Sequence, residues 1–140
     1  MKKLTNILSL FLLLLMAACS DKDVINSKEG VSLPAVTNLA LQQVDPQSVK
    51  LTWNIPGAIS PKIKQPLKVY IEVREIVSIT RSVVIFSTTL ENAPSEYVYT
   101  LPVNTKTYHL TVKLNGSTVE SDPYYSSNIY SPGQTVVYTK

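Results

Sequence analysis

Three segments of the chain alternate apolar and polar residues with a period of two. In residues 49–54, 67–74 and 108–114 every second side chain is apolar, which is typical of a strand with one buried face. No segment sustains the 3.6-residue period of an amphipathic helix. The alternation therefore predicts an all-β fold.

Weaker strand signals cover residues 37–44, 82–90 and 96–101, and a last strand is expected within residues 118–138. Nine prolines are spread between the strand segments, where they mark turns and sheet edges. Asp45-Pro46 predicts a turn, and Asn115-Gly116 favours a two-residue type I′ hairpin because both residues tolerate positive φ. About seven short strands in about 100 residues predict a Greek-key β-sandwich.

Several features occur in the order expected of one sandwich family. A proline-led first strand covers residues 34–39, a second strand ends in Trp53, and a third strand covers residues 70–74. Leu101 and then Tyr108 lead into the sixth strand. This order resembles a fibronectin type III domain, with Trp53 as its core tryptophan and Tyr108 as its corner tyrosine.

The resemblance covers roughly residues 34–123 and implies an immunoglobulin-like (fibronectin type III-like) Greek-key β-sandwich of about seven strands. The motifs that carry it are signatures of the fold, and none of them is an active site. The spacing between Leu101 and Tyr108 departs from the family pattern, because the proline follows the leucine directly and the tyrosine comes one residue late. The sequence therefore leaves open whether the hydrogen bond of the tyrosine corner forms. Residues 124–140 either form the last strand or extend the sheet edge.

The first 18 residues have the composition of an export signal. Lys2 and Lys3 give a positive start, and residues 7–18 form an apolar run that is shorter than the ~20 residues of a membrane-spanning helix. Residues 15–19, Leu-Met-Ala-Ala-Cys, resemble the lipobox of bacterial lipoproteins. The resemblance implies cleavage before Cys19 and a membrane anchor of lipid on that cysteine. The alternative is a soluble protein whose cleavage site happens to end in cysteine.

The segment Ser20, Asp21, Lys22 and Asp23 resembles the surface-export signal of Bacteroidetes-type lipoproteins. This resemblance implies a lipid-anchored outer-membrane protein at the cell surface, with the periplasmic face as the alternative. A plain solvated linker would have a similar composition. We expect residues 1–18 to be the signal peptide, residues 19–33 the lipidated cysteine and flexible tether, and residues 34–140 the sandwich with a C-terminal extension.

Charge and cysteine content argue against several classes of function. Without the two lysines of the leader, the chain has 11 basic and 10 acidic side chains, so nucleic acid is not an expected partner. Cys19 is the only cysteine, which excludes an intramolecular disulfide and a cysteine-based zinc site. His109 is the only histidine, and it is expected on the outward face of its strand. We expect no catalytic residue, metal or cofactor.

Carboxylates that lie close in sequence are the remaining candidates for catalysis, because a glycosidase needs two of them flanking a sugar. Glu72 and Glu75 point to opposite faces of a strand, and we expect Glu72 to pair with Arg74 for ~0–1 kcal/mol. The other two pairs fall in expected loops that lack aromatic neighbours on both sides, which makes an enzyme the weakest hypothesis. These pairs are Glu91 with Glu96 and Glu120 with Asp122.

Loops that follow the second, fourth and sixth strands share one end of such a sandwich. Residues 56–66, 91–95 and 115–117 should therefore lie together, beside the start of the first strand and the tether. The first of these loops carries three prolines, and its lysines, together with Lys68, have no adjacent acid in the sequence. We predict either a stiff basic surface or a solvated loop that guards a sheet edge. The candidate binding residues are Pro61, Lys62, Lys64, Asn115, Gly116 and Ser117.

Eight tyrosines against two phenylalanines are an unusual aromatic composition. Tyr124, Tyr125, Tyr130 and Tyr138 fall near the C-terminus, where their rings would stack on sugars, cover the edge strand of a partner, or simply pack in the core. The leading hypothesis is a non-catalytic, membrane-anchored surface lipoprotein that serves as a recognition or spacer module in glycan handling or adhesion. Its partner would be a glycan or an outer-membrane protein. The alternative is an assembly subunit that pairs with a partner through its C-terminal strand.

Overall fold

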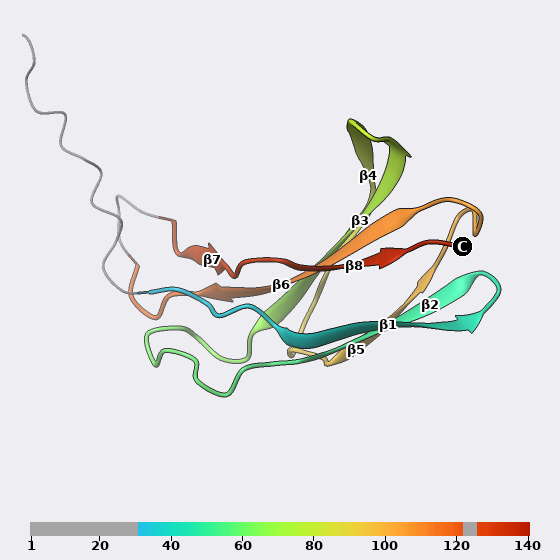
Figure 1. Cartoon of the computed structure of the whole chain (residues 1–140). Coiled ribbons are helices and arrows are strands. Elements are labelled where there is room, and N and C mark those ends of the chain that lie inside the picture. Colours follow the sequence, from blue (N-terminus) through green and yellow to red (C-terminus); the bar gives the residue numbers. More distant parts are fainter. Residues whose placement is uncertain (1–30, 122–125) are drawn as a thin grey trace, which may run out of the picture.

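The computed structural model describes residues 31–121 and 126–140, which contain strands and no helix (Figure 1). Cys19, the segment Ser20–Asp23, and Tyr124 and Tyr125 lie outside the described residues. Within the described ranges, no helix is long and apolar enough to cross a membrane. The strands are β1 Thr37–Asp45, β2 Ser48–Asn54, β3 Lys68–Ser78, β4 Arg81–Leu90, β5 Glu96–Thr100, β6 Tyr108–Ser117, β7 Asn128–Tyr130 and β8 Gln134–Tyr138.

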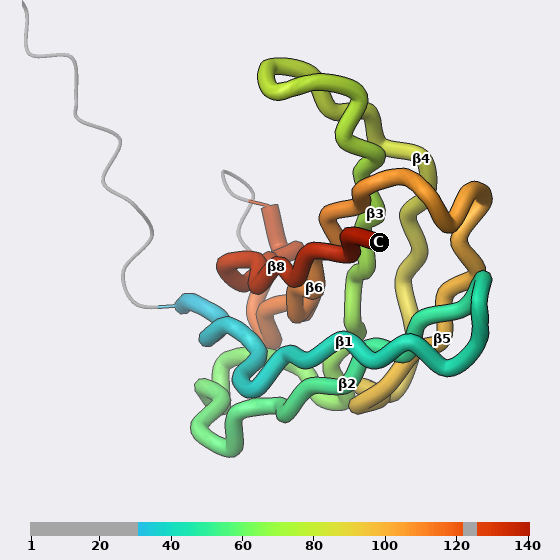
Figure 2. The backbone as a smooth tube through the Cα atoms, turned by 45° about the vertical axis from the view of Figure 1, so that its right-hand side comes forward, coloured from blue at the N-terminus to red at the C-terminus, as the bar shows by residue number. Residues whose placement is uncertain are grey.

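The strands form two antiparallel sheets that pack face to face (Figure 2). The smaller sheet has the order β1-β2-β5, and the larger sheet has the order β4-β3-β6-β7. Strand β8 also pairs with β6, along residues 108–112, whereas β7 pairs with residues 115–117. This is an immunoglobulin-like Greek-key sandwich, so the predicted fold class is confirmed.

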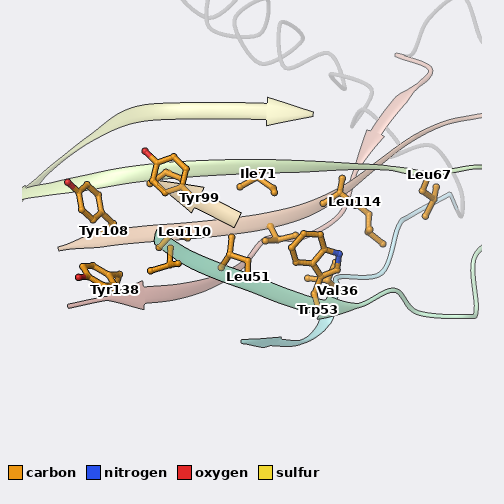
Figure 3. Packing of buried hydrophobic residues seen from close by; sticks show 14 of the residues in the cluster. Val36, Leu51, Trp53, Leu67, Ile71, Tyr99, Tyr108, Leu110, Leu114 and Tyr138 are labelled. Atoms are coloured by element: carbon orange, nitrogen blue, oxygen red, sulfur yellow. The ribbon is translucent and has the colours of Figure 1, made fainter. Parts of the chain in front are cut away.

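The core between the sheets comes from alternate residues of β2, β3 and β6 (Figure 3). Each of these strands buries every second side chain, as the period of two predicts. Trp53 is only 2% exposed and lies near the middle of this layer. Burying a large apolar side chain contributes about 1.5–3 kcal/mol. The alternating core residues are Val49, Leu51, Trp53, Val69, Ile71, Val73, Tyr108, Leu110, Val112 and Leu114.

The tyrosine corner forms despite the altered spacing around it. The hydroxyl of buried Tyr108 donates a hydrogen bond to the carbonyl of Val103 at 2.9 Å and accepts one from the Val103 N–H at 3.3 Å. Tyr138 of β8 donates to the carbonyl of Asn104 in the same loop at 3.0 Å. Two tyrosines therefore tie the β5–β6 loop to the core.

Asp45-Pro46 forms the predicted turn between β1 and β2, in which the Asp45 carboxylate accepts a hydrogen bond from the Gln47 N–H at 2.8 Å. The hairpin predicted at Asn115-Gly116 is wrong, because β6 continues to Ser117 and pairs with both β3 and β7 there. A Cβ atom at Gly116 would lie 2.9 Å from Cγ2 of Ile63 and 3.0 Å from Cδ2 of Leu67. The glycine at this position permits a close approach inside the core, so its role is not to form a turn.

The last strand is divided into β7 and β8 by Ser131, Pro132 and Gly133. Ser131 is buried, and its N–H donates to the Leu114 carbonyl at 2.9 Å while its Oγ accepts from the Leu114 N–H at 2.8 Å. Pro132 has no N–H to donate to a ladder, which explains the break. The sequence left open whether the C-terminal residues form the last strand or extend the sheet edge. Residues 128–138 form the last strand, in two pieces that both pair with β6 at the edge of the larger sheet.

Candidate recognition surface

The β2–β3 loop closes one end of the sandwich and carries the first set of predicted binding residues. Ile63 is 3% exposed and forms an isolated bridge with Thr118. The Lys64 N–H donates to the carbonyl of Ser117 at 2.8 Å, and the Val119 N–H donates to the carbonyl of Lys62 at 2.8 Å. The loop therefore lies against the end of β6, as predicted, and is held there by a buried side chain.

Only part of this predicted set is open to solvent. Pro61, Lys62 and Lys64 are exposed, whereas Asn115 and Gly116 are buried within β6. The prediction that residues 115–117 form a surface loop is therefore wrong, because all three belong to β6 and pair with β7, and Asn115 also pairs with β3. The basic part of the loop is the accessible part.

The β4–β5 loop also lies at this end, as predicted. It supplies Glu91, which pairs with Nζ of Lys68 at 2.8 Å. Lys68 has no adjacent acid in the sequence, but the pairing of Val69 with Leu90 brings the next residue, Glu91, to the start of β3. Lys62 and Lys64 have no ion pair among residues 31–121 and 126–140.

The described chain begins at the same end. Leu33 and Val36 are buried in the core, and Cδ1 of Leu33 lies 3.4 Å from where a Cβ atom on Gly116 would sit. Figure 1 shows residues 31–36 beside β7 and above the β2–β3 loop. Residues 31–36 therefore lie at the same end of the sandwich as the β2–β3 loop (Figure 1).

Four of the carboxylates that were considered for catalysis are held in ion pairs. Glu72 pairs with Arg74 at 2.6 Å, as predicted, and Glu75 pairs with Lys106 at 2.6 Å. Glu91 and Glu96 pair with Lys68 and Lys50, respectively. In the described part of the chain, no group of three or more His, Cys, Asp or Glu residues is arranged to hold a metal ion. These carboxylates serve as partners of cations along the strands.

The larger sheet has a polar and aromatic side that faces away from β1, β2 and β5, which we call the outer face. The strand registers place Tyr70 opposite Lys113, Glu72 opposite Thr111, and Arg74 opposite His109. His109 is half-buried there, on the predicted outward side of β6. The members of the outer face are Tyr70, Glu72, Arg74, His109, Thr111, Lys113, Tyr130, Thr135 and Val137.

Two tyrosines meet on the outer face. Tyr130 of β7 is 55% exposed, and its ring packs edge-on against Tyr70 with the centroids 6.0 Å apart and the planes at 81°. Of the candidate residues of the aromatic patch, Tyr124, Tyr125 and Tyr130, the structure describes Tyr130 alone. Tyr138, also considered for that patch, is 4% exposed and belongs to the core. The exposed pair combines an apolar ring surface with hydroxyl groups.

Polar groups next to the rings form a connected set. The carboxylate of Glu72 accepts a hydrogen bond from Arg74 Nε at 2.6 Å and one from the Tyr70 hydroxyl at 3.3 Å. The hydrogen bond from Arg74 lowers the pKa of Glu72, with smaller contributions from the Tyr70 hydroxyl and the charge of Lys113. Thr111 and Thr135 share a hydrogen bond at 2.8 Å. The face therefore presents both hydrogen-bond donors and acceptors beside an exposed ring.

Sequence reasoning placed Tyr70, Glu72, Arg74, Thr111 and Lys113 on strands without combining them into a surface. The signal was available, because the outward positions of residues 67–74 and 108–114 are polar or amphipathic. What the sequence does not give is the pairing of β3 with β6 that makes these positions neighbours.

A family model described as "Domain of unknown function (DUF4945)" matches residues 19–138. The chain belongs to this family. No curated protein matches the DUF4945 chain in sequence.

Solved structures similar to the DUF4945 chain include fibronectin type III domains. The third such domain of the human KIAA0343 protein matches with a TM-score of 0.52 and 13% identity, covering 84% of this chain and 91% of that one. A fibronectin type III domain of human collagen XX matches with a TM-score of 0.46 and 20% identity, covering 79% and 97%, respectively. At this identity the first likeness shows the fold alone, and it agrees with the resemblance seen in the sequence.

Proposed function

We propose that this DUF4945 chain is a lipid-anchored recognition module of a bacterial outer membrane, which binds a glycan on the outer face of its larger sheet. Its fibronectin type III-like sandwich suggests a non-catalytic binding or spacer module. Beyond a binding or spacer role, we propose a lipid anchor, a location at the outer membrane and a glycan as the ligand.

The anchor is supported by the leader and by the way the chain enters the sandwich. The segment Leu-Met-Ala-Ala-Cys ends at Cys19, and the family match begins at that same residue. Thirteen residues, 20–32, lie between Cys19 and Leu33, the first buried side chain of the core. A chain of this length spans about 40 Å when extended, so the loop end of the sandwich would stay near the membrane.

The ligand class is supported by the Tyr70–Tyr130 pair, which is the observation that carries the proposal. Sugars offer flat apolar faces with hydroxyl groups around their rim. An exposed aromatic ring stacks on such a face, while nearby carboxylate, guanidinium and ammonium groups bond the hydroxyls. Tyr130, Glu72, Arg74 and Lys113 provide this combination within one side of one sheet.

Glycan binding is tested by applying the mature protein to an array of bacterial and host polysaccharides. Tyr130→Ala should reduce binding of the best glycan at least tenfold, because it removes the exposed ring. Val137→Ala is the matched control, since Val137 is 51% exposed on the same face and lies away from the two rings. Equal binding by the parent and Tyr130→Ala would contradict the assignment of this face.

The location is tested by treating intact cells with protease and blotting for the sandwich, with a periplasmic protein as the control that must survive. Digestion supports surface display, and survival until the outer membrane is broken contradicts it. Cys19→Ala tests the anchor separately, because this variant should lose incorporation of labelled fatty acid.

The alternative proposal, assembly through the C-terminal strand, has less support from the geometry. Strand β8 pairs with β6 of its own chain through residues 134–138, and β1 lies close to it. At the opposite edge of the larger sheet, β4 pairs with β3 alone.

A further inference from the structure

One cation of the outer face lies next to the two tyrosine rings. Lys113 of β6 is directly opposite Tyr70 in the pairing with β3. Tyr130 of β7 is opposite Asn115, two residues further along β6, so Lys113 and Tyr130 are diagonal neighbours. Residues in this relation lie about 7–8 Å apart, within reach of a long side chain. Lys113 therefore flanks the place where a sugar would stack on Tyr130.

The stem of Lys113 lies over the backbone between β7 and β8. A Cβ atom at Gly133 would lie 3.0 Å from Cε and 3.4 Å from Cγ of Lys113, so the glycine permits this close approach. Lys113 is half-buried, as expected of a lysine that covers its methylene groups and keeps its ammonium in water. A cation held in this way loses less freedom on binding an anion than a lysine on an open surface does.

The other charges on this side of the sheet already have partners. Glu72, the carboxylate of the outer face, pairs with Arg74 at 2.6 Å, and Lys68 at the start of β3 pairs with Glu91 at 2.8 Å. Lys113 has no ion pair among residues 31–121 and 126–140. Its charge acts on Glu72 only as a smaller contribution to the lowered pKa of that carboxylate. The outer face therefore has one cation in excess of its acids.

We propose that the glycan bound on the outer face is acidic, and that Lys113 binds its carboxylate or sulfate group while a sugar ring stacks on Tyr130. This inference rests on the proposed function and narrows its class of ligand. An anionic group forms a charge-assisted hydrogen bond with the ammonium of Lys113, whereas a neutral sugar leaves the excess charge of the face without a partner. Glu72 does little to repel the anion, because Arg74 neutralises it.

The β2–β3 loop is the competing place for an anion. Lys62 and Lys64 are exposed there, and neither has an ion pair in the described part of the chain. Residues 55–67 contain no aromatic side chain, so the loop offers charge without a ring on which a sugar can stack. Lys113 combines an unpaired charge with a neighbouring exposed ring, and the acidic group is therefore assigned to Lys113.

The test compares polysaccharides that differ in charge and little else. Isothermal titration calorimetry of the full chain in a mild detergent is carried out with two matched pairs: polygalacturonate with its carboxyl-reduced form, and dextran sulfate with dextran. In at least one pair the acidic member should bind at least about tenfold more tightly, because a hydrogen bond between charged groups is lost with the acid. The pair that responds shows whether the acid is a carboxylate or a sulfate.

Variants of Lys113 locate the acidic group. Lys113→Gln should weaken binding of the acidic polymer at least about fivefold and leave binding of its neutral form unchanged. Lys113→Arg keeps the charge and should stay within about threefold of the parent. Arg81→Gln is the matched control, since it removes one exposed positive charge at the start of β4, away from the two rings. Equal losses for Arg81→Gln and Lys113→Gln would mean that only the net charge of the protein matters, and would overturn the assignment.

Three further results would overturn the inference. They are equal or absent binding of both members in both pairs, acidic binding that Lys113→Gln does not change, and a loss seen only when Lys62 and Lys64 are both changed to Gln. A neutral glycan that binds on the array and depends on Tyr130 would leave the proposed function standing while this inference fails. If no glycan binds on the array and neither pair binds, the proposed function fails as well, so the two failures are distinguishable.

Discussion

The β2–β3 loop and residues 76–85 at the end of the β3–β4 hairpin, which we call the hairpin arm, both carry large aliphatic side chains beyond the regular sandwich, and the two segments use them in opposite ways. Ile63 of the loop is 3% exposed, whereas Ile79 at the tip of the arm is fully exposed. The loop is also tied to residues 117–119 by backbone hydrogen bonds, whereas the arm makes its last such bond to the sandwich at Ile76. Ile63 at the loop end is therefore part of the core, whereas Ile79 at the tip of the arm is part of the surface.

The largest effect is expected at the loop end. Ile63→Ala should lower the free energy of unfolding by about 2–4 kcal/mol, because it empties a filled position against Gly116 and Leu67. Urea unfolding followed by the fluorescence of Trp53, the only tryptophan, measures this change. A loss below about 0.5 kcal/mol would mean that the loop does not close the core.

Gly116→Ala tests the same contact from the opposite side. The added methyl group would meet Ile63 and Leu67 at 2.9 and 3.0 Å, so those side chains must move. Overpacking of this kind should cost about 1–3 kcal/mol in the same unfolding experiment. The double variant Gly116→Ala with Ile63→Ala should cost less than the sum of the two changes, because the smaller side chain at position 63 makes room for the methyl group.

The base of the hairpin arm depends on the tyrosine corner. The β5–β6 loop contacts this base through Lys106, which bonds Glu75 at 2.6 Å, and through the bond from Ile76 to Thr107. Tyr108→Phe should lower the free energy of unfolding by about 1–2 kcal/mol, because it leaves the backbone of Val103 without its partner. Tyr138→Phe, which removes one bond to Asn104, is the milder comparison. Equal losses for the two variants would show that the corner has no special role.

The sandwich was largely predictable from the sequence because its core follows a strict period of two. Trp53, Ile71 and Leu110 are buried where the alternation places them, and their strands have nearly the predicted bounds. Asn115-Gly116 misled the prediction because this dipeptide suits either a type I′ turn or a close approach between packed segments. Which of these applies depends on Ile63, which is 53 residues away in the sequence, and local patterns carry no information at that separation.

The candidate surface was less predictable than the fold. Tyr130 was singled out from composition, but its partner Tyr70 lies on β3 and becomes a neighbour only through the pairing of both strands with β6. The hairpin arm was only partly predicted, because the strands expected at residues 67–74 and 82–90 leave residues 75–81 between them unassigned. Their exposure follows from β6 beginning only at Tyr108, opposite Glu75, so that the arm has no sheet to cover it.

A smaller effect, dependent on pH, is expected on the outer face. Glu72→Gln should lower the free energy of unfolding at neutral pH by about 0–1 kcal/mol, the usual range for a partly exposed ion pair. Because the pKa of Glu72 is lower in the folded protein than in the unfolded chain, its contribution is full above the unfolded pKa. The contribution is lost as the pH falls through the folded pKa, so the two proteins should converge in acid. A difference that persists in acid would point to packing instead of charge.

The smallest effect is expected at the tip of the hairpin arm. Ile79→Ala should change the free energy of unfolding by no more than about 0.5 kcal/mol, because the side chain is fully exposed and its loss leaves no cavity. The same substitution at Ile63 therefore provides a direct comparison between the two ends of the molecule. If Ile79→Ala destabilised the protein as much as Ile63→Ala, the arm would pack on its own chain and the contrast between the two ends would be lost.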